Sequence, residues 1–359
     1  MKKIKIWNKV VNLAFILSLA FTITACGNSK STSGIDEVEA QTKTTEENAV
    51  DKTSGITVPK IRVATQPGVY AANILLVKKN GYFQEELEKL GYSDVEITWD
   101  SFESGPPMNE AFAAGAEDIG LIGDVPLLVA KASGQETVTF AKLSAGETTV
   151  ALTLPIDSDI TEPAQLKGKK VAYVKGSYGQ HFLGLVLEEA GLTFDDIEQV
   201  NLPNADIGNA VASEQVDAGI IWEPGLSSTL STGKIKILLD GTGIKSNNVF
   251  FFSNADFAQN NPDGLVAFIK AVERANQEII EDPEGAAQQL EGEINLPTET
   301  LAVLLKKYDF SAYINDSDID ELKIVEQFNR EQGFAVNTVD VETFVDRQYL
   351  ESAGITNGN

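Results

Sequence analysis

Residues 118–126 read DIGLIGDVP, and residues 216–224 read VDAGIIWEP. In both stretches a short apolar run, typical of a buried strand, ends in a turn that contains an acidic residue and proline. A segment with helical periodicity follows each turn. A strand, a turn and a helix in this order form the repeating unit of α/β proteins. Both halves of the chain are therefore predicted to belong to an α/β fold.

The same alternation continues on both sides of these stretches and indicates two series of strands in largely parallel sheets. The first series is expected at residues 61–64, 95–99, 118–122, 138–141 and 150–154. The second series is expected at residues 170–174, 197–202, 218–222 and 235–239. Residues 249–252 are expected to return to the first series, before helices at 262–281, 298–308, 318–332 and 341–349.

A chain that visits a second series of strands and then returns predicts two lobes joined by two crossings. We expect these crossings in the turn-rich segments 154–161 and 240–248. Residues 58–156 would then form the first part of lobe 1 and residues 157–244 would form lobe 2. Residues 245–354 would return to lobe 1 and supply the C-terminal helices. One large doubly wound sheet is the alternative architecture that the pattern leaves open.

The first 25 residues have the pattern of a secretory signal: four lysines, an apolar run over residues 10–21 and small residues before Cys26. This run is too short for a comfortable transmembrane helix, which needs ~20 residues. Cys26 is the only cysteine, and its surroundings resemble a bacterial lipobox, which implies cleavage before it and acyl chains on it. An ordinary secretory signal and an uncleaved anchor are the alternatives. Residues 26–57 are polar and are expected to be a disordered tether.

The charge and the rarity of cysteine and histidine exclude several classes of protein. The formal net charge is −25, and loss of the signal removes four lysines and no acids, which leaves −29. Such a surface repels nucleic acid. With Cys26 acylated, no thiol remains for a disulfide or a thiolate metal site. Residues 315–320 loosely resemble a calcium loop but lack its glycine, and no Gly-x-Gly-x-x-Gly follows the first strand, so no metal or cofactor is expected.

Six strand-to-helix turns are the candidate ligand site. They lie at residues 65–68, 104–107, 123–126, 176–179, 204–206 and 222–224. In open α/β sheets such turns meet at the carboxyl ends of the strands, where ligands bind, and each helix start offers free N–H groups to an anion. Their capping residues include no Arg or Lys, so Ser104, Gly105 and Ser177 are the principal candidates for holding an anionic group. The alternative is that these residues are ordinary helix caps.

Several of these segments resemble the aliphatic-sulfonate-binding proteins, within a group that also binds nitrate, taurine and thiamine precursors. They are FESGPP (102–107), residues 118–126, LKGKKVA (166–172), Gly176-Ser177, LPNAD (202–206) and residues 216–224. The resemblance covers residues 60–354. It implies a type II periplasmic-binding-protein fold and a ligand clamped between two lobes. The ligand-binding residues that it implies are Gly68, Ser104, Gly105, Asp124, Val125, Ser177, Tyr178, Asp206, Trp222 and Glu223.

The resemblance further implies a monomeric, non-enzymatic solute-binding lipoprotein on the extracytoplasmic face of the cell membrane, whose partners are an ABC permease and its ATPase. Its ligand would be a small sulfonate-type anion or zwitterion, either an alkanesulfonate or taurine. Nitrate, bicarbonate, a thiamine-precursor pyrimidine and a sensor without a transport role are the alternatives. The chain departs from these relatives at Glu223, where they carry Asp, and at Tyr178, where they carry a small polar residue.

Two questions about charged and titratable residues remain open in the sequence. Asp206 and Glu223 either cap their own helices or face the amino end of a zwitterionic ligand. His181, the only histidine, lies four residues after Ser177, which raises the possibility of a catalytic Ser/His pair. No nucleophile-elbow motif surrounds Ser177, so we expect His181 to lie on a helix surface or pocket rim rather than to act as a base.

Overall fold

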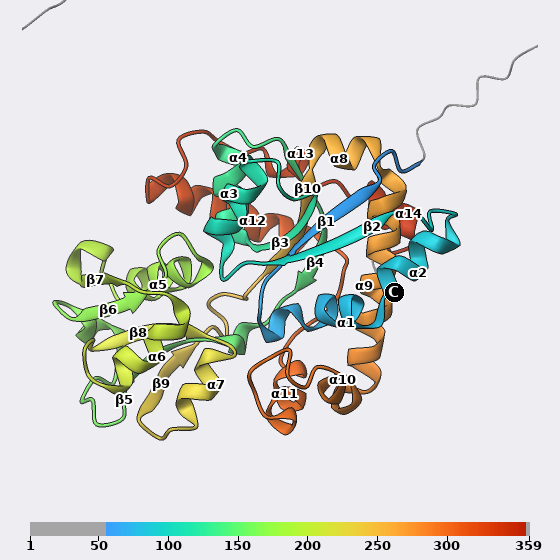
Figure 1. The fold of residues 1–359 in the computed structure, drawn as a ribbon. Helices are drawn as coiled ribbons and strands as arrows, with labels where there is room; N and C mark the ends of the chain where they lie inside the picture. Colours follow the sequence, from blue (N-terminus) through green and yellow to red (C-terminus); the bar gives the residue numbers. More distant parts are fainter. Residues whose placement is uncertain (1–54, 357–359) are drawn as a thin grey trace, which may run out of the picture. The chain divides into compact units, whose positions relative to one another are not determined.

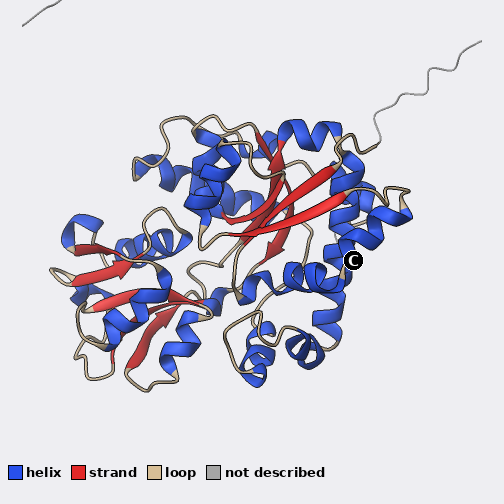
Figure 2. Cartoon of the chain, in the orientation of Figure 1, coloured by secondary structure: helices blue, strands red, loops and turns tan. Residues whose placement is uncertain are grey.

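The computed structural model describes residues 55–356, so the signal peptide, Cys26 and most of the expected tether lie outside the described residues. The described chain contains two five-stranded sheets, each in its own lobe (Figure 1; Figure 2). The first has the order β2-β1-β3-β10-β4, with β1 (Lys60–Thr65), β2 (Glu96–Ser101), β3 (Ile119–Gly123), β4 (Thr137–Ser144) and β10 (Val249–Asn254). The second has the order β7-β6-β8-β5-β9, with β5 (Val150–Pro155), β6 (Lys170–Tyr173), β7 (Glu198–Asn201), β8 (Ala218–Trp222) and β9 (Ile235–Asp240). All ten expected strands are confirmed.

Both sheets are mixed, but in each sheet four of the five strands run in the same direction and one is reversed, so the expected mostly parallel sheets are confirmed. β1 runs parallel to β2 and β3, but β10 runs antiparallel to β3 and β4. In the second sheet β6 runs parallel to β7 and β8, but β5 runs antiparallel to β8 and β9. The reversed strand in each sheet is the one by which the chain arrives from the other lobe, without the crossover helix that parallel neighbours require. Two separate sheets also exclude the single doubly wound sheet.

The first connection between the lobes lies earlier than expected. β5 pairs with β8 and β9, so it belongs to the second lobe, and the connection is residues 145–149 instead of 154–161. The boundary at residue 156 is therefore wrong, because a strand buried along its length carries no mark of the sheet that it joins. The second connection is residues 241–248. The two connections are hydrogen bonded, since the Asn247 N–H donates to the Gly146 carbonyl at 3.1 Å.

Helices pack around both sheets (Figure 2). The second lobe contains α5 (Tyr178–Glu189), α6 (Asn204–Ala212) and α7 (Gly225–Leu230). The first lobe contains α1 (Ala72–Asn80), α2 (Tyr82–Lys89), α3 (Gly105–Ala113), α4 (Asp124–Ala132), α8 (Ala255–Asn260), α9 (Pro262–Glu281), α10 (Pro283–Gln289), α11 (Thr298–Leu305), α12 (Asp316–Glu331), α13 (Val341–Phe344) and α14 (Gln348–Ala353). The expected helix over 341–349 is wrong. It is interrupted because Val345 forms a bridge with Thr139 of β4, and the Asp346 N–H donates to the Thr139 carbonyl at 2.8 Å.

Aromatic side chains form the centre of the first lobe. Phe251 of β10 meets Phe268 of α9 edge to face, with ring centroids 5.0 Å apart, and Phe140 of β4 packs against both rings. Order begins before residue 58, since the Thr57 N–H donates to the Asn261 side chain at 2.7 Å. The expected disordered tether is therefore wrong for its last residues. Between residues 55 and 356, no helix is both long and apolar enough to cross a membrane.

Candidate functional site

The two lobes enclose a small cavity of ≈ 40 Å³ at the carboxyl ends of the strands. The starts of α3 and α5 contribute to it from opposite lobes, and the second connection closes it. Its lining residues are Gln66, Tyr70, Ser104, Gly105, Pro106, Gly123, Pro126, Ser177, Tyr178, Trp222, Asn247 and Val249. We call this space the inner cavity. Five of the ten expected ligand-binding residues line it: Ser104, Gly105, Ser177, Tyr178 and Trp222.

The start of α3 presents Ser104 and Gly105 to the inner cavity. Ser104 has extended backbone geometry at the N-cap, and its side chain makes no capping hydrogen bond. Pro106 and Pro107 have no N–H, so they leave no orphan donor in the first turn. Gly105 cannot be larger, because a Cβ there would lie 2.6 Å from Cγ of Pro126. The hydroxyl of Ser104 and the N–H of Gly105 are therefore the donors that this helix start offers a ligand.

The start of α5 brings an aromatic wall across the cavity. The Tyr178 ring lies 5.1 Å from Trp222, centroid to centroid, and its Cδ1 reaches within 3.7 Å of where a Cβ on Gly123 of the first lobe would be. The Tyr178 hydroxyl is buried and has no hydrogen-bond partner among residues 55–356. Burial raises the pKa of Tyr178 well above its usual value, so the phenol is a neutral donor. The Ser177 hydroxyl donates to the Val174 carbonyl at 2.7 Å.

Seven lining residues were not among the expected ligand-binding residues, and three of these seven have polar side chains: Gln66, Tyr70 and Asn247. The Tyr70 hydroxyl donates to Oε1 of Gln66 at 2.9 Å, and the Gln66 amide donates to the Leu121 carbonyl at 3.2 Å. Gln66 belongs to the flagged turn 65–68, so its position could have been anticipated. Asn247 lies in the second connection, where no strand-to-helix turn marks it.

An outer groove of ≈ 500 Å³ shares Tyr70, Ser104 and Trp222 with the inner cavity. Gly68, another expected residue, lines this groove. Its charged lining residues are Glu103 and Glu293, both exposed and both from the first lobe. A ligand held in the inner cavity could therefore extend a second group past Trp222 into a wider and acidic space.

Four of the expected ligand-binding residues line neither space. Asp124 and Val125 are buried at the start of α4, where Asp124 pairs with Lys245 and the Val125 carbonyl accepts from Asn329. Asp206 lines a separate groove between α6 and α7. Glu223 is buried and accepts from the N–H and the hydroxyl of Ser227 at 3.0 and 2.8 Å. The reading of Glu223 as a cap of its own helix therefore agrees with the structure.

His181 is buried at the interface between α5 and α12, so the expectation of a surface or rim position is wrong. Its ring lies 4.4 Å from Phe328 of the first lobe, and neither ring nitrogen has a partner among the described residues. Burial, aided by the charge of Lys245, lowers the pKa of His181 to about 2. Its nitrogens make no hydrogen bond to Ser177, whose hydroxyl donates to the Val174 carbonyl.

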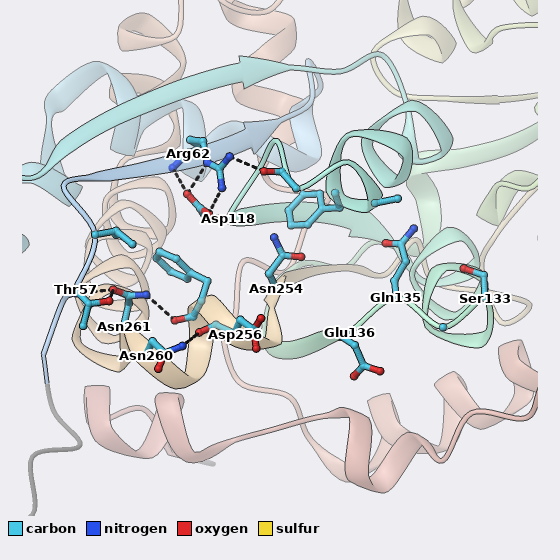
Figure 3. A pocket seen from close by; sticks show the side chains of 16 residues that line it. Thr57, Arg62, Asp118, Ser133, Gln135, Glu136, Asn254, Asp256, Asn260 and Asn261 are labelled. Carbon is cyan, nitrogen blue, oxygen red and sulfur yellow. Dashed lines mark hydrogen bonds and ion pairs between the residues drawn. The ribbon is translucent and has the colours of Figure 1, made fainter. Parts of the chain in front are cut away.

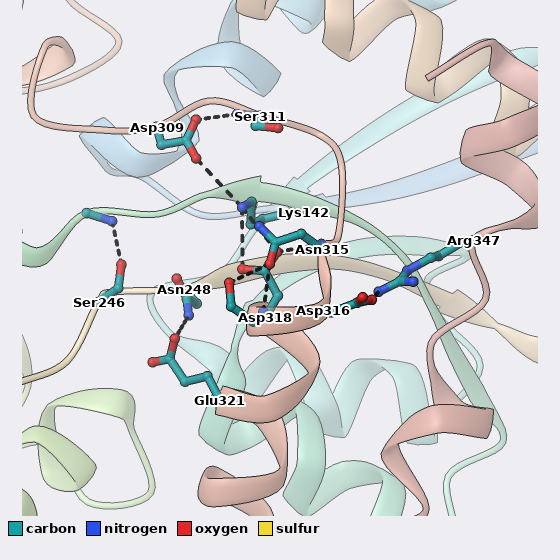
Figure 4. A network of polar contacts seen from close by, with 12 residues as sticks. Lys142, Ser246, Asn248, Asp309, Ser311, Asn315, Asp316, Asp318, Glu321 and Arg347 are labelled. Carbon is teal, nitrogen blue, oxygen red and sulfur yellow. Dashed lines mark hydrogen bonds and ion pairs between the residues drawn. The ribbon is translucent and has the colours of Figure 1, made fainter. Parts of the chain in front are cut away.

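Two polar regions outside the cleft have structural explanations. Arg62 lines a hollow of ≈ 760 Å³ in the first lobe. Its guanidinium donates two hydrogen bonds to the carboxylate of Asp118, at 2.9 and 2.5 Å (Figure 3). The acidic segment 315–320 starts α12, where Asn315 and Asp318 form a capping box (Figure 4). Asp318 also lies 3.3 Å from the buried Lys142.

Comparison with known proteins agrees with this architecture. A family described as "NMT1/THI5 like" matches residues 69–286. A protein of Escherichia coli (strain K12) named for binding aliphatic sulfonates is 34% identical over 212 residues, which is 59% of this chain and 63% of that protein. A protein of the same name from Bacillus subtilis (strain 168) is 28% identical over 297 residues, 82% of this chain and 88% of that protein.

A solved structure gives the same result for the fold. The alkanesulfonate-binding protein SsuA from Xanthomonas axonopodis pv. citri, bound to MOPS, superposes with a TM-score of 0.73 at 25% identity. The alignment covers 82% of this chain and 100% of that structure. The expected two-lobed periplasmic-binding-protein fold is thereby confirmed.

Proposed function

From the premise that the chain belongs to the NMT1/THI5-like family, we propose that it is the solute-binding component of an ABC importer. Its ligand is a small sulfonate-type anion or zwitterion, an alkanesulfonate or taurine, clamped between the two lobes. The names of the similar proteins from Escherichia coli and Bacillus subtilis support the sulfonate class. Its proposed partners are the permease and the ATPase of that importer.

The observation that carries the proposal is the uncharged, donor-bearing lining of the inner cavity. No Asp, Glu, Lys or Arg is among its twelve lining residues. The donors are the Ser104 hydroxyl, the Gly105 N–H and the Tyr178 phenol, and they come from both lobes. A ligand bound to all three bridges the lobes, which is what a closing clamp requires.

Neutral donors suit a sulfonate better than a localised charge. Its negative charge is spread over three oxygens, so several hydrogen bonds serve it better than one counter-charge. The first N–H groups of a helix lack intrahelical partners, and each helix start adds ~0.3–1 kcal/mol for an anion, or up to ~2 when partly buried. The starts of α3 and α5 therefore offset part of the repulsion from a protein whose net charge is −29 after loss of the signal.

The inner cavity and the outer groove differ in size, so they suit different parts of a ligand, a small head and a longer tail. A space of ≈ 40 Å³ has room for a group of a few heavy atoms, since one water needs ~10–15 Å³ on the same measure. The oxoanion head belongs there. The outer groove of ≈ 500 Å³ has room for a tail, which leaves past Tyr70 and Trp222.

The proposal includes attachment to the extracytoplasmic face of the cell membrane by acyl chains on Cys26, with the protein acting as a monomer. The attachment is inferred from the sequence around Cys26, which lies outside the described residues.

Titration calorimetry on the purified full chain tests the ligand class. Alkanesulfonates and taurine should bind saturably with one-to-one stoichiometry and without turnover. Nitrate, bicarbonate and a thiamine-precursor pyrimidine are the comparison ligands. Ser104→Ala should weaken sulfonate binding about tenfold, the effect of one lost hydrogen bond to a charged group. Binding of a comparison ligand in place of every sulfonate would overturn the proposal.

A further inference from the structure

Two side chains of the inner cavity each leave one buried polar atom without a partner among the described residues. They are the Tyr178 hydroxyl and Oδ1 of Asn247. The phenol is a donor and the amide oxygen is an acceptor, so the two atoms make opposite demands on a ligand. An oxoanion satisfies the phenol, but it would be repelled by the amide oxygen.

The orientation of the Asn247 amide follows from its neighbour. The Thr149 hydroxyl donates its single proton to the Gly146 carbonyl at 2.8 Å. Thr149 Oγ1 can therefore only accept from Asn247, and the Asn247 Nδ2 lies 3.4 Å from it. If the amide were flipped, Oδ1 of Asn247 would face Oγ1 of Thr149, and both atoms would be acceptors. One of the two amide protons is thus engaged, and Oδ1 is the side-chain atom of Asn247 that has no partner among the described residues.

We propose that Asn247 is a specificity-determining residue, which selects ligands that carry an N–H or O–H donor close to the anionic group. The preferred ligand is then an amino or hydroxy sulfonate rather than a plain alkanesulfonate. This inference rests on the proposed function. A ligand with the donor pairs this buried acceptor, whereas a ligand without the donor leaves it unpaired, which is unfavourable.

Other residues near the cleft do not account for such a preference. Glu223 is occupied by Ser227, and Asp206 lines another groove. Glu103 and Glu293 are exposed in the outer groove and do not line the inner cavity. Asn247 also belongs to the second connection, so a ligand bonded to it and to Tyr178 links this connection to α5 of the second lobe.

Calorimetry with three sulfonates of equal length tests the selection on the purified full chain. Taurine carries an ammonium group, 2-hydroxyethanesulfonate a hydroxyl, and 1-propanesulfonate a methyl at the same position. Wild type should bind the first two about five- to a hundredfold more tightly than the third. Asn247→Leu should abolish this preference, mainly by weakening taurine. Equal affinities in wild type, or a preference that survives in Asn247→Leu, would overturn the inference.

Asn329→Leu is the matched control. Asn329 is also a buried asparagine whose amide donates to a carbonyl and whose Oδ1 has no partner among residues 55–356, but it does not line the inner cavity. This variant should keep the wild-type preference, and its loss there would overturn the assignment to Asn247. Asn247→Ala takes the place of the leucine variant if that one does not fold.

A second ligand pair separates failure of this inference from failure of the proposed function. β-Alanine and butanoate differ in the same way as taurine and 1-propanesulfonate, but they carry a carboxylate. If no sulfonate binds, while β-alanine is preferred over butanoate only when Asn247 is present, the sulfonate class is wrong and the role of Asn247 stands. If neither pair binds, both proposals are overturned.

Discussion

Lys245 of the second connection and Asp124 at the start of α4 form an ion pair in which each side chain is only 1% exposed. Glu321 of α12 lies 3.1 Å from the same ammonium group. Its carboxylate also accepts from the Asn248 amide, as Figure 4 shows. Burial disfavours the charged form of Lys245, but the carboxylates of Asp124 and Glu321 outweigh it and raise the pKa of Lys245. The pair therefore fixes the connection to the first lobe.

Removing one partner of this pair should destabilise the protein strongly. Lys245→Met leaves the carboxyl group of Asp124 buried without its partner, which costs about 3–5 kcal/mol. The double variant Lys245→Met with Asp124→Leu removes both charges, and it should recover most of that loss. Urea denaturation of the wild type, both single variants and the double variant measures the coupling. Additive losses in the double variant would show that the two residues act independently.

His181 should make stability fall toward acid pH. Its pKa is about 2 in the folded protein and 6.5 when exposed, so between these values the unfolded chain binds the additional proton. Stability is then complete above pH 6.5 and decreases by ~1.4 kcal/mol per unit below it. At pH 5 the loss is about 2 kcal/mol. His181→Phe keeps a ring against Phe328 and should remove this loss.

The measurement is denaturant unfolding of wild type and His181→Phe at pH 7.5, 6 and 5. The comparison must be made between the two proteins, because Glu117 titrates in the same range with the opposite sign. Burial and the neighbouring Asp100 raise the pKa of Glu117 to about 7, so its protonated form favours the folded state and this stability is lost as pH rises toward 7. Parallel pH profiles for the two proteins would contradict the prediction for His181.

The strands and the helix starts could be predicted from the sequence because their signals are local. The run 119–122 is apolar and includes two β-branched isoleucines, and Ser104-Gly105 followed by two prolines marks the start of α3. The signal that decides which sheet a strand joins is not local, because it depends on the strands that pair with it. β5 has the same apolar character as the strands before it, and only its pairing with β8 and β9 assigns it to the second lobe.

The candidate site was predictable only where a turn and a helix start coincide. Ser104, Gly105, Ser177 and Tyr178 follow this rule and meet in one cavity. Asn247 does not, because its role depends on the hydroxyl of Thr149, about a hundred residues away. Asp124 obeys the rule and still lies outside the cavity, because Lys245 pairs with it.

Cys26→Ala should release the protein from the membrane. The acyl chains expected on Cys26 are the only anchor that the proposed function requires, so without them nothing holds the cleaved protein to the membrane. Fractionation of cells that express wild type and variant, followed by immunoblotting of membrane and soluble fractions, measures the distribution. Equal membrane retention of both proteins would contradict acylation of Cys26.

Ligand binding should close the lobes. In the closed arrangement without a ligand, the Tyr178 hydroxyl and Oδ1 of Asn247 are buried and unpaired, at about 1–3 kcal/mol each. This penalty favours a more open form of the free protein, and a ligand that satisfies both atoms removes it. Small-angle scattering should therefore give a smaller radius of gyration with saturating taurine. An unchanged radius at saturation would show that the free protein is already closed.

Glu223→Gln should lower stability without changing ligand preference. The carboxylate is fully buried, accepts two hydrogen bonds from Ser227 and lies 3.8 Å from Lys307 of the first lobe. Loss of its charge weakens these contacts by about 1.5–3 kcal/mol in the free energy of unfolding. Because Glu223 does not line the inner cavity, taurine and 1-propanesulfonate should be affected by the same factor. Calorimetry with both ligands and urea denaturation of the variant measure the two effects. A selective loss of taurine binding in Glu223→Gln would instead place an ammonium group beside this carboxylate, and it would transfer the role that we assign to Asn247.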